Sequence, residues 1–413
     1  MKNRQHGGER VVLVHIYFPV DKMEEDLEEF KELAYSAGAQ VVGVVTGKKS
    51  APEAKLFVGQ GKAEEIRDAV LSTKAELVIF NHVLTPAQER NIERLVHCRV
   101  LDRTELILDI FSKRARSFEG KLQVELAQLQ YLSTRLVRGW THLERQRGGI
   151  GLRGPGETQL ETDRRLIRNK IKTITAKLEK LAKQREMKRR ARRRAKTPTV
   201  ALVGYTNAGK STLFNQLTHS SVYVANQLFA TLDPTFRRIH FPEMGTVILA
   251  DTVGFIRHLP HHLVEAFHAT LEEVSEANLL LHIVDASNEQ KKAQIDEVNK
   301  VLQSIHAEEV PCLMVYNKID LVSHLKENTG YDESLNRVFI SAKEKLNMKE
   351  LIQAISHLLG KEMMEGSLIL SPEQAKLRAY LYEREAVISE EIDEAGCYHL
   401  VIRLPRVELE KLL

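Results

Sequence analysis

The sequence predicts an α/β fold with mostly parallel sheets, in which an antiparallel helical hairpin separates two strand-and-helix domains. Short β-branched runs alternate with amphipathic segments in residues 1–115 and again in residues 198–361, whereas long helical patterns occupy residues 116–197. Strand–helix alternation of this length is typical of parallel sheets covered by helices. Residues 362–413 are predicted to form a small C-terminal tail or domain.

Composition indicates a globular protein of the cytoplasm. The chain has 413 residues, of which 43% are hydrophobic and 28% are charged, and its three cysteines are widely spaced. This profile is that of several folded domains without a disulfide framework or a cysteine metal site. No apolar run reaches the about 20 residues that span a bilayer, and residues 1–10 lack the apolar core of a signal peptide. We therefore expect a monomeric cytoplasmic protein with no integral membrane segment, and leave peripheral membrane association open.

Positive charge is concentrated just before the second strand-and-helix domain. The formal net charge is +4, yet the segment Lys180–Lys196 alone holds ten basic residues and one acidic residue. Lysine and arginine at this density neutralise phosphates and release counterions, which favours a polyanionic partner such as RNA. A solvated, charged helix end is the alternative interpretation.

The N-terminal domain is predicted from four short strands and the helices between them. Val11–Phe18 and Val41–Thr46 are β-branched runs, which indicates buried strands. Between them, Met23–Ala37 has one apolar face and is followed by Gly38, as expected of an amphipathic helix. The alternation continues with two helices and two strands, at Lys62–Ser72, Leu77–Asn81, Thr85–Cys98 and Val100–Asp102.

Two long helices are predicted to fold back on each other as the hairpin. The first carries its apolar residues on one face, at Leu122, Leu126, Leu129 and Leu136. The second has the four–three spacing of a coiled-coil seam, at Ile167, Ile171, Ile174, Leu178 and Leu181. Between them, residues 148–156 contain five glycines, a composition that favours a flexible, non-helical tip. We interpret this tip as a probe for RNA or protein, with a simple long turn as the alternative.

A phosphate-binding loop opens the domain at residues 198–361. The apolar strand Thr199–Val203 runs directly into the loop, and the helical pattern Thr212–Leu217 follows it. The loop consists of Gly204, Tyr205, Thr206, Asn207, Ala208, Gly209, Lys210 and Ser211. Its glycines let successive backbone N–H groups point at phosphates, and the helix adds its positive end. Lys210 is expected to contact the β- and γ-phosphates as a catalytic residue, and Ser211 to ligate Mg²⁺.

Three further motifs stand at strand ends in the same domain. They consist of Asp251, Thr252, Val253 and Gly254, then Asn317, Lys318, Ile319 and Asp320, and finally Ser341, Ala342 and Lys343. Asp251 is expected to hold Mg²⁺ through water, and the Gly254 amide to meet the γ-phosphate in the catalytic centre. The Asp320 carboxylate can accept two N–H bonds from guanine, whereas adenine presents the opposite pattern and is rejected.

The remaining residues of the last two motifs are expected to complete a guanine site. Asn317 and Lys318 brace the site and pack on the base, and residues 341–343 add a backbone N–H to the guanine carbonyl oxygen. Asp285, which follows another apolar strand, is interpreted only as the end of that strand.

With these four motifs in order, the domain resembles the TRAFAC class of P-loop GTPases. Where that class has its first switch, this chain has Phe229, Ala230, Thr231, Leu232 and Asp233, followed by Pro234 and Thr235. Together with Asp251–Ile256 and Gly154–Thr158, this form is similar to the HflX family of ribosome-associated GTPases, over roughly residues 10–360. The resemblance implies that residues 229–233 contact the nucleotide and that Thr231 is the catalytic threonine that ligates Mg²⁺. Thr235 is the alternative candidate for that threonine.

The resemblance also implies an activity and a partner. Members of this family hydrolyse GTP to GDP and phosphate with Mg²⁺ and bind the large (50S) ribosomal subunit, and some split or rescue ribosomes under stress. A role in translation or ribosome biogenesis follows from the same association. Asn207 resembles the asparagine that coordinates K⁺ in related GTPases, which makes K⁺ a further candidate cofactor and Asn207 a candidate catalytic residue. Phe255 stands where many Ras-like enzymes place a water-orienting glutamine, so we expect slow intrinsic hydrolysis.

Two other functions are compatible with the sequence. An RNA-binding assembly factor would keep its nucleotide as a structural element, and its affinity for RNA would not depend on the nucleotide state. A signalling GTPase would act on a protein or a membrane surface, and its basic helix would bind anionic lipids rather than ribosomes. DNA is not an expected partner of any of the three.

Overall fold

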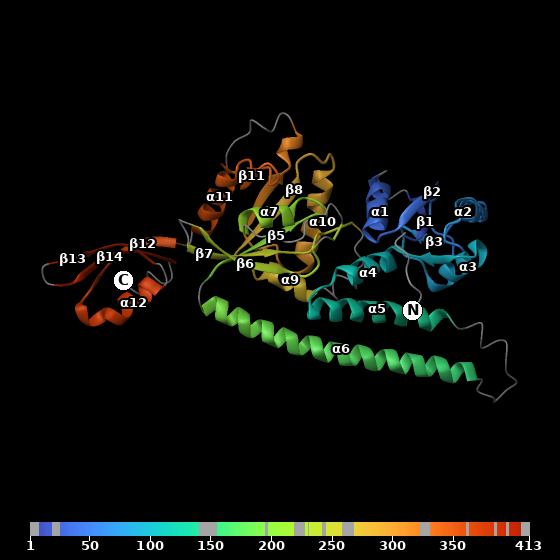
Figure 1. Cartoon of the computed structure of the whole chain (residues 1–413), viewed down its shortest axis with the longest axis horizontal. Coiled ribbons are helices and arrows are strands. Elements are labelled where there is room, and N and C mark those ends of the chain that lie inside the picture. Colours follow the sequence, from blue (N-terminus) through green and yellow to red (C-terminus); the bar gives the residue numbers. More distant parts are fainter. Residues whose placement is uncertain are drawn as a thin grey trace. The chain divides into compact units, whose positions relative to one another are not determined.

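The computed structural model of the chain describes residues 8–18, 25–139, 155–194, 197–218, 228–229, 231–241, 245–257, 268–322, 331–360, 363–383, 386–393 and 396–405. The chain divides into two compact units (Figure 1). The first comprises Met1–Arg194 and two later segments, Tyr223–Pro234 and Val253–Leu271. The second comprises Ala195–Val222, Thr235–Thr252 and Glu272–Leu413. Among the described residues, no helix is both long enough and apolar enough to cross a membrane.

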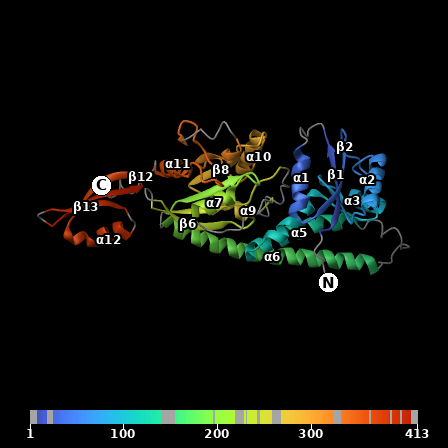
Figure 2. The same ribbon diagram turned by 45° about the horizontal axis from the view of Figure 1, so that its top comes forward.

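The first unit begins with a parallel four-stranded sheet in the order β2-β1-β3-β4. Its strands are β1 (Arg10–Tyr17), β2 (Gln40–Lys48), β3 (Leu77–Phe80) and β4 (Arg99–Leu101). The helices are α1 (Glu25–Ser36), α2 (Gln60–Thr73), α3 (Pro86–Val96) and α4 (Arg103–Arg114). Helices α2 and α3 pack on one face of the sheet, and α1 and α4 on the other (Figure 2). This parallel sheet with helices on both faces confirms the predicted α/β domain. Strands covered on both faces are apolar along their length, which explains the apolar runs in the sequence.

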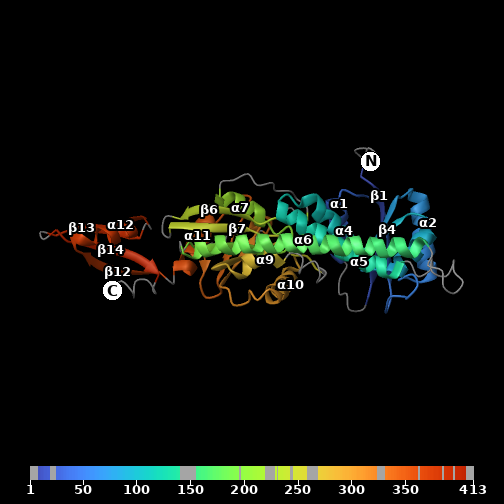
Figure 3. The same ribbon diagram turned by 90° about the horizontal axis from the view of Figure 1, so that it is seen from below.

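Helices α5 (Phe118–Gly139) and α6 (Pro155–Arg194) pack side by side as the predicted hairpin (Figure 3). Glu119 of α5 pairs with Arg185 of α6, and Glu125 pairs with Lys170. The partners therefore follow opposite orders along the two helices, as antiparallel packing requires. Residues 148–154 lie outside the described part of the chain, but α6 already begins at residue 155. The prediction that residues 155–156 are non-helical is therefore wrong, because a proline is tolerated in the first turn of a helix.

Arg135 attaches α5 to the N-terminal sheet. Its guanidinium donates to the carbonyl oxygen of Leu84 at 2.7 Å and pairs with Glu89 of α3 at 2.8 Å. It also pairs with Asp102, whose side chain is fully buried where α4 begins. A buried carboxylate is costly to leave unpaired, so these contacts hold α5 firmly on the sheet. Helix α5 and the N-terminal sheet are therefore expected to move as one body.

The second unit contains a seven-stranded sheet in the order β10-β11-β9-β8-β5-β7-β6. Its strands are β5 (Thr199–Gly204), β6 (Thr235–Phe241), β7 (Gly245–Asp251), β8 (Leu279–Asp285), β9 (Cys312–Asn317), β10 (Tyr331–Asp332) and β11 (Arg337–Phe339). Strands β6 and β10 are antiparallel to their neighbours, and the other pairs are parallel. Its helices include α7 (Lys210–Thr218), α10 (Lys291–Ser304) and α11 (Met348–Gly360), while α9 (His268–Ser275) crosses the boundary between the units.

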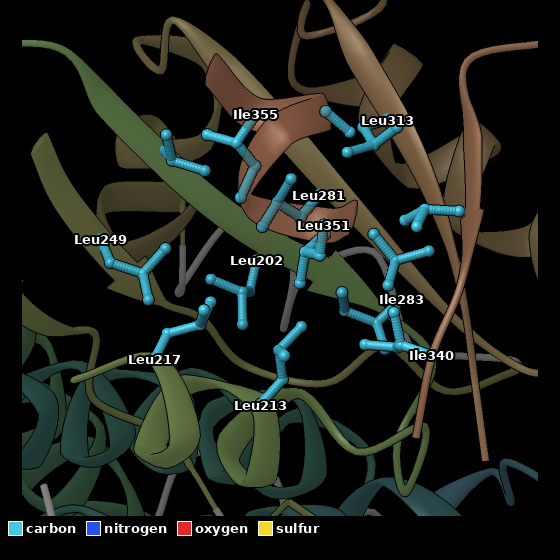
Figure 4. Close-up of a cluster of buried hydrophobic side chains, with 14 of the residues drawn as sticks. Leu202, Leu213, Leu217, Leu249, Leu281, Ile283, Leu313, Ile340, Leu351 and Ile355 are labelled. Carbon is cyan, nitrogen blue, oxygen red and sulfur yellow. The ribbon is translucent and has the colours of Figure 1, made fainter. Parts of the chain in front are cut away.

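A cluster of buried aliphatic side chains holds two helices against this sheet (Figure 4). Leu202 of β5 and Leu281 of β8 lie in one cluster with Leu213 of α7 and Leu351 of α11, all fully buried. Helices α7 and α11 therefore cover one face of the sheet, whereas α10 contacts β5 and β8. This packing confirms the predicted mostly parallel α/β domain. It also places the carboxyl ends of β5, β7, β8 and β9, which carry the predicted motifs, at the same edge of the sheet.

The C-terminal residues form a small antiparallel sheet in the order β12-β14-β13. Its elements are β12 (Met363–Leu370), the short 3₁₀ helix η3 (Pro372–Gln374), α12 (Ala375–Glu383), β13 (Val387–Ile392) and β14 (Tyr398–Pro405). The sequence predicts a helix at Ser371–Tyr382 and a strand at His399–Arg403, which α12 and β14 confirm, but it does not predict β12 or β13. Strand β13 contains Ser389, Glu390 and Glu391 in succession, so it lacks the apolar alternation that indicates a strand.

Candidate functional site

Two glycines of the phosphate-binding loop stand where no side chain fits. Gly204, the last residue of β5, has a φ of +146°, and a Cβ there would lie 2.3 Å from the carbonyl oxygen of Ile283. Gly209 has a φ of +97°, and its Cβ would lie 2.2 Å from Nδ2 of Asn317. Both the backbone angles and these approaches require glycine. The loop is thus packed against β8 and β9 before it enters α7.

The other residues of the loop differ in exposure. Tyr205, Thr206 and Ala208 are buried, whereas Asn207 is exposed at the turn and has a φ of +61°. Asparagine adopts this left-handed conformation more readily than most residues. The residue type is therefore explained locally by the turn, and its exposed amide is accessible to a cation.

Lys210 carries its positive charge inside the curve of the loop. Its Nζ donates to the carbonyl oxygens of Gly204 at 3.0 Å and Tyr205 at 2.7 Å, and the residue is buried. Burial lowers the pKa of Lys210 to about 8, with the nearby Asp251 opposing the shift. The amine therefore remains mostly protonated at neutral pH, in the position from which a lysine can bind phosphate oxygens.

Ser211 and Asp251 present two oxygen donors beside that lysine. The Ser211 hydroxyl donates to Oδ2 of Asp251 at 2.8 Å, and Asp251 is fully buried at the end of β7. Among the described residues, no group of three or more His, Cys, Asp or Glu is placed to hold a metal by itself. Mg²⁺ prefers such hard oxygens and usually shares them with phosphates and water. The donor set therefore fits the predicted Mg²⁺, with Ser211 as a ligand.

Asn317 connects the phosphate-binding loop to the last motif. Its Nδ2 donates to the carbonyl oxygen of Ala208 at 2.9 Å, and its Oδ1 accepts from the backbone N–H of Ala342 at 2.9 Å. The residue is only 2% exposed, so both hydrogen bonds form in a dry interior. Asn317 therefore positions residues 341–343 relative to the loop.

Asp320 is oriented by Ser341. The Ser341 hydroxyl donates to Oδ1 of Asp320 at 2.6 Å, and Ser341 is fully buried. Ile319 is buried too, whereas the Lys343 side chain is 80% exposed. An ionised carboxylate held in this way presents its acceptors in a fixed direction, as reading a base edge requires. Lys343 is left to contribute through its backbone.

Lys318 has a partner that the sequence did not reveal. Its Nζ pairs with Oδ2 of Asp285 at 2.7 Å, and Oδ1 of Asp285 accepts from the Ser287 hydroxyl at 2.5 Å. Asp285 ends β8 directly opposite Asn317, which ends the neighbouring parallel strand β9. The aspartate interpreted as a strand end therefore also fixes the lysine of the predicted guanine site. The only available signal was that Asp285 ends one apolar strand and Lys318 directly follows the next.

Replacing Asp285 by asparagine is expected to weaken GTP and GDP binding equally, by about tenfold. The amide still accepts from Ser287, so the turn survives, but Lys318 loses the carboxylate that directs its side chain across the base. The dissociation rate of a fluorescent GDP analogue measures the effect. Asp296→Asn on α10 is the matched control and is expected to leave the rate unchanged. An unaltered rate in Asp285→Asn would show that Lys318 needs no partner.

The residues predicted for the first switch belong to the first unit. Phe229 is 2% exposed and makes an edge-to-face contact with Phe111 of α4, with ring centroids 4.7 Å apart. Leu232 is buried as well, Thr231 is partly exposed, and Ala230 lies outside the described residues. Thr235, the alternative metal-binding threonine, is not in a loop, because it begins β6 and pairs with Asp251.

The residues that follow Thr252 in the second motif also belong to the first unit. Val253, Gly254 and Phe255 are buried. The carbonyl oxygen of Arg257 accepts a hydrogen bond of 2.8 Å from Arg103, which in turn pairs with Glu29 at 2.8 Å. The phosphate-binding loop, Asp251, Thr252 and the two guanine motifs all lie in the second unit. The residues predicted to contact the nucleotide are therefore not all assigned to one compact unit.

Three family models match the chain one after another. Residues 24–112 match the model described as GTP-binding GTPase N-terminal, and residues 114–192 match GTP-binding GTPase middle region. Residues 199–318 match the model described as 50S ribosome-binding GTPase.

Individual relatives match over nearly the whole length. The GTPase HflX of Escherichia coli (strain K12) is 55% identical over 414 residues, which cover 100% of this chain and 97% of the relative. The GTPase HflX of Caldanaerobacter subterraneus subsp. tengcongensis is 50% identical over 396 residues, which cover 96% of this chain and 91% of the relative. Among solved structures, the crystal structure of the SsGBP and GDP complex has a TM-score of 0.50 and 25% identity, and covers 86% of this chain and 99% of that chain.

Proposed function

The chain belongs to the HflX family of GTPases, and from this membership we propose that its hydrolysis of GTP is a switch for association with the large ribosomal subunit. It acts in the cytoplasm on the RNA and proteins of that subunit, in translation, in ribosome splitting or rescue under stress, or in ribosome biogenesis. The family model described as 50S ribosome-binding GTPase supports this target.

The observation that carries the proposal is the basic surface of α6. This helix has 40 residues. Its exposed side chains include Arg165, Arg168, Lys172, Lys177, Lys180 and Lys183. Several exposed cations along one long helix suit the phosphate backbone of RNA, because each neutralised phosphate releases a counterion. A folded RNA such as that of a ribosomal subunit provides such a backbone.

The main residues of the nucleotide site have distinct proposed roles. The amides of the phosphate-binding loop and Lys210 bind the phosphates and stabilise the charge that develops on them. Ser211, Asp251 and Thr231 would hold Mg²⁺, which neutralises the β- and γ-phosphates. Asp320 selects guanine, and the Gly254 amide meets the γ-phosphate. Phe255 is an apolar ring that cannot orient water, so the attacking water must be oriented by a group outside this position.

GTP hydrolysis with and without purified large ribosomal subunits, in potassium buffer, tests the proposal. The subunits are expected to raise the rate at least about tenfold, because they supply or position the missing group. The variant Lys177→Glu/Lys180→Glu/Lys183→Glu should lose most of this stimulation while keeping its basal rate. Lys292→Glu/Lys300→Glu on α10 reverses two charges elsewhere and should behave as the unaltered protein.

Absence of stimulation, with GTP binding intact, would contradict the ribosomal target. It would favour the signalling alternative, which predicts binding to anionic vesicles or to a protein target. Binding to RNA with equal affinity in the GTP and GDP states would instead favour the assembly factor.

Potassium is proposed as a second cation, held through Asn207. The exposed, left-handed position of this residue supports the proposal. Replacing Na⁺ by K⁺ at constant ionic strength is expected to raise basal hydrolysis about tenfold, because a cation at this position can substitute for an arginine finger. Asn207→Gly keeps the backbone angle and removes the amide oxygen, so it should abolish the difference between the salts. Equal rates in KCl and NaCl for the unaltered chain would refute the idea.

A further inference from the structure

The first-switch segment, defined as residues 228–229 and 231–234, carries a carboxylate that binds the start of α5. Oδ2 of Asp233 accepts from the backbone N–H groups of Arg116 at 2.7 Å and Ser117 at 2.8 Å. Its Oδ1 accepts from the Ser117 hydroxyl at 2.5 Å. Ionised acceptors make stronger hydrogen bonds than neutral ones, and the positive end of a helix favours them further. The Asp233 carboxylate thus binds the N-terminus of α5 at Ser117, which lies 116 residues earlier in the sequence.

Ser117 joins this contact to the helix itself. Its hydroxyl oxygen accepts from the backbone N–H of Gly120 at 2.8 Å, which is the usual capping bond at the beginning of a helix. The same hydroxyl donates its proton to Asp233. One side chain therefore satisfies the first turn of α5 and binds the first-switch segment.

Gly120 has the residue type that this contact demands. Glycine is unfavourable within a helix, yet it occupies the third position of α5. A Cβ at this position would lie 2.0 Å from Oδ1 of Asp233 and 3.0 Å from Oγ of Ser117. The absence of a side chain at Gly120 therefore leaves space for the Asp233 carboxylate.

The same segment is held at a second point, on the other side of Thr231. The backbone N–H of Leu228 donates to Oγ of Ser36 at 3.0 Å, and Phe229 packs on Phe111. Phe229 adopts a φ of +56°, which is unusual for a bulky residue and requires support from its surroundings. Thr231 therefore lies between two attachments to the first unit. The attachment by Asp233 is solvent-exposed and can open without disturbing the core.

We propose that Ser117 and Asp233 are positioning residues for Thr231, in a latch that links the nucleotide state to helix α5. The inference rests on the proposed role of Thr231 in the GTP-bound state. With the latch closed, the attachments on both sides of Thr231 restrain the first-switch segment. With GTP bound, Thr231 moves to its site, Asp233 leaves α5, and the start of the hairpin is released. By linkage, whatever loosens the start of α5 favours GTP.

Two variants open the latch without removing the helix cap. Gly120→Ala raises helix propensity but drives a methyl group into Asp233. Ser117→Asp still accepts from the Gly120 amide, but repels the Asp233 carboxylate. Each is expected to raise the ratio of affinities for a GTP analogue and GDP about tenfold. The matched controls are Gly61→Ala in α2, where the added Cβ meets nothing within 4 Å, and Ser117→Thr, which keeps the hydroxyl.

The rate of hydrogen exchange at the Arg116 and Ser117 amides distinguishes a latch from a purely structural contact. If Ser117 and Asp233 were only structural, the rate would not depend on the bound nucleotide. In the unaltered protein these amides should exchange at least about tenfold faster with the GTP analogue than with GDP. In Gly120→Ala they should exchange fast with both. Unchanged affinity ratios in both variants, or equal exchange with the two nucleotides, would overturn the latch. Neither experiment contains ribosomal subunits, so a negative result leaves the proposed partner untouched, and failed stimulation by subunits leaves the latch untouched.

Discussion

Lys210→Ala is expected to lower the affinity for both GTP and GDP at least about a hundredfold. The lysine places a charge inside the loop, between the carbonyl oxygens of Gly204 and Tyr205. Alanine leaves the loop amides in place but removes the charged partner of the phosphates. Isothermal titration with each nucleotide measures the loss, which should be of similar size for the two.

The same variant should remain folded. Burial lowers the pKa of Lys210 to about 8, below its unfolded value, so the folded state penalises the charged amine. Removing the amine therefore removes an electrostatic cost at pH 7, which offsets lost packing. Thermal unfolding without nucleotide checks this, with Lys292→Ala as a surface control. Normal GTP affinity in Lys210→Ala would show that the phosphates bind elsewhere.

Asp320→Asn is expected to change which base the protein accepts. The carboxylate can accept from both N–H groups of the guanine edge, whereas an amide accepts one bond and donates one. Affinity for GTP should therefore fall at least about a hundredfold, and affinity for xanthosine triphosphate should rise by a similar factor. Ser341 still has a partner at position 320, so the site should keep its shape.

Competition between the two nucleotides for a fluorescent GDP analogue gives both affinities in one experiment. Asp332→Asn, at the last residue of β10, makes the same chemical change away from the site and should leave base preference unaltered. If Asp320→Asn weakened GTP binding without improving xanthosine triphosphate binding, the aspartate would be a structural residue rather than the one that reads the base.

The fold of the nucleotide domain and its motifs could be predicted because their signals are local. The phosphate-binding loop lies between an apolar strand and a helix that are adjacent in sequence, and Asp251 and Asn317 each end their own strand. The seam of α6 could be predicted for the same reason, since its period is visible in one segment. Residues 167, 171, 174, 178 and 181 are indeed less exposed than most of their neighbours.

Contacts between distant segments could not be predicted in this way. The ion pair of Asp285 with Lys318 depends on β8 and β9 being neighbours in register, and the sequence does not state the order of strands. The bonds from Asp233 to Arg116 and Ser117 join segments that share no pattern. Strand β12 was missed because its partner β14 is separated from it by α12 and β13, whereas β13 forms a hairpin with β14 but is largely polar.

The two hydrogen bonds of Asn317 also have a consequence for the timing of biosynthesis. They tie the phosphate-binding loop to a strand and a loop that are made much later, at residues 317 and 342. A growing chain exposes its phosphate-binding loop while the guanine-reading half of the pocket is still untranslated. Because domains acquire their packing only when all their strands are present, a nascent chain cannot retain a guanine nucleotide. We therefore expect the nascent chain to retain a guanine nucleotide only after residues 317 and 342 have both emerged from the ribosome.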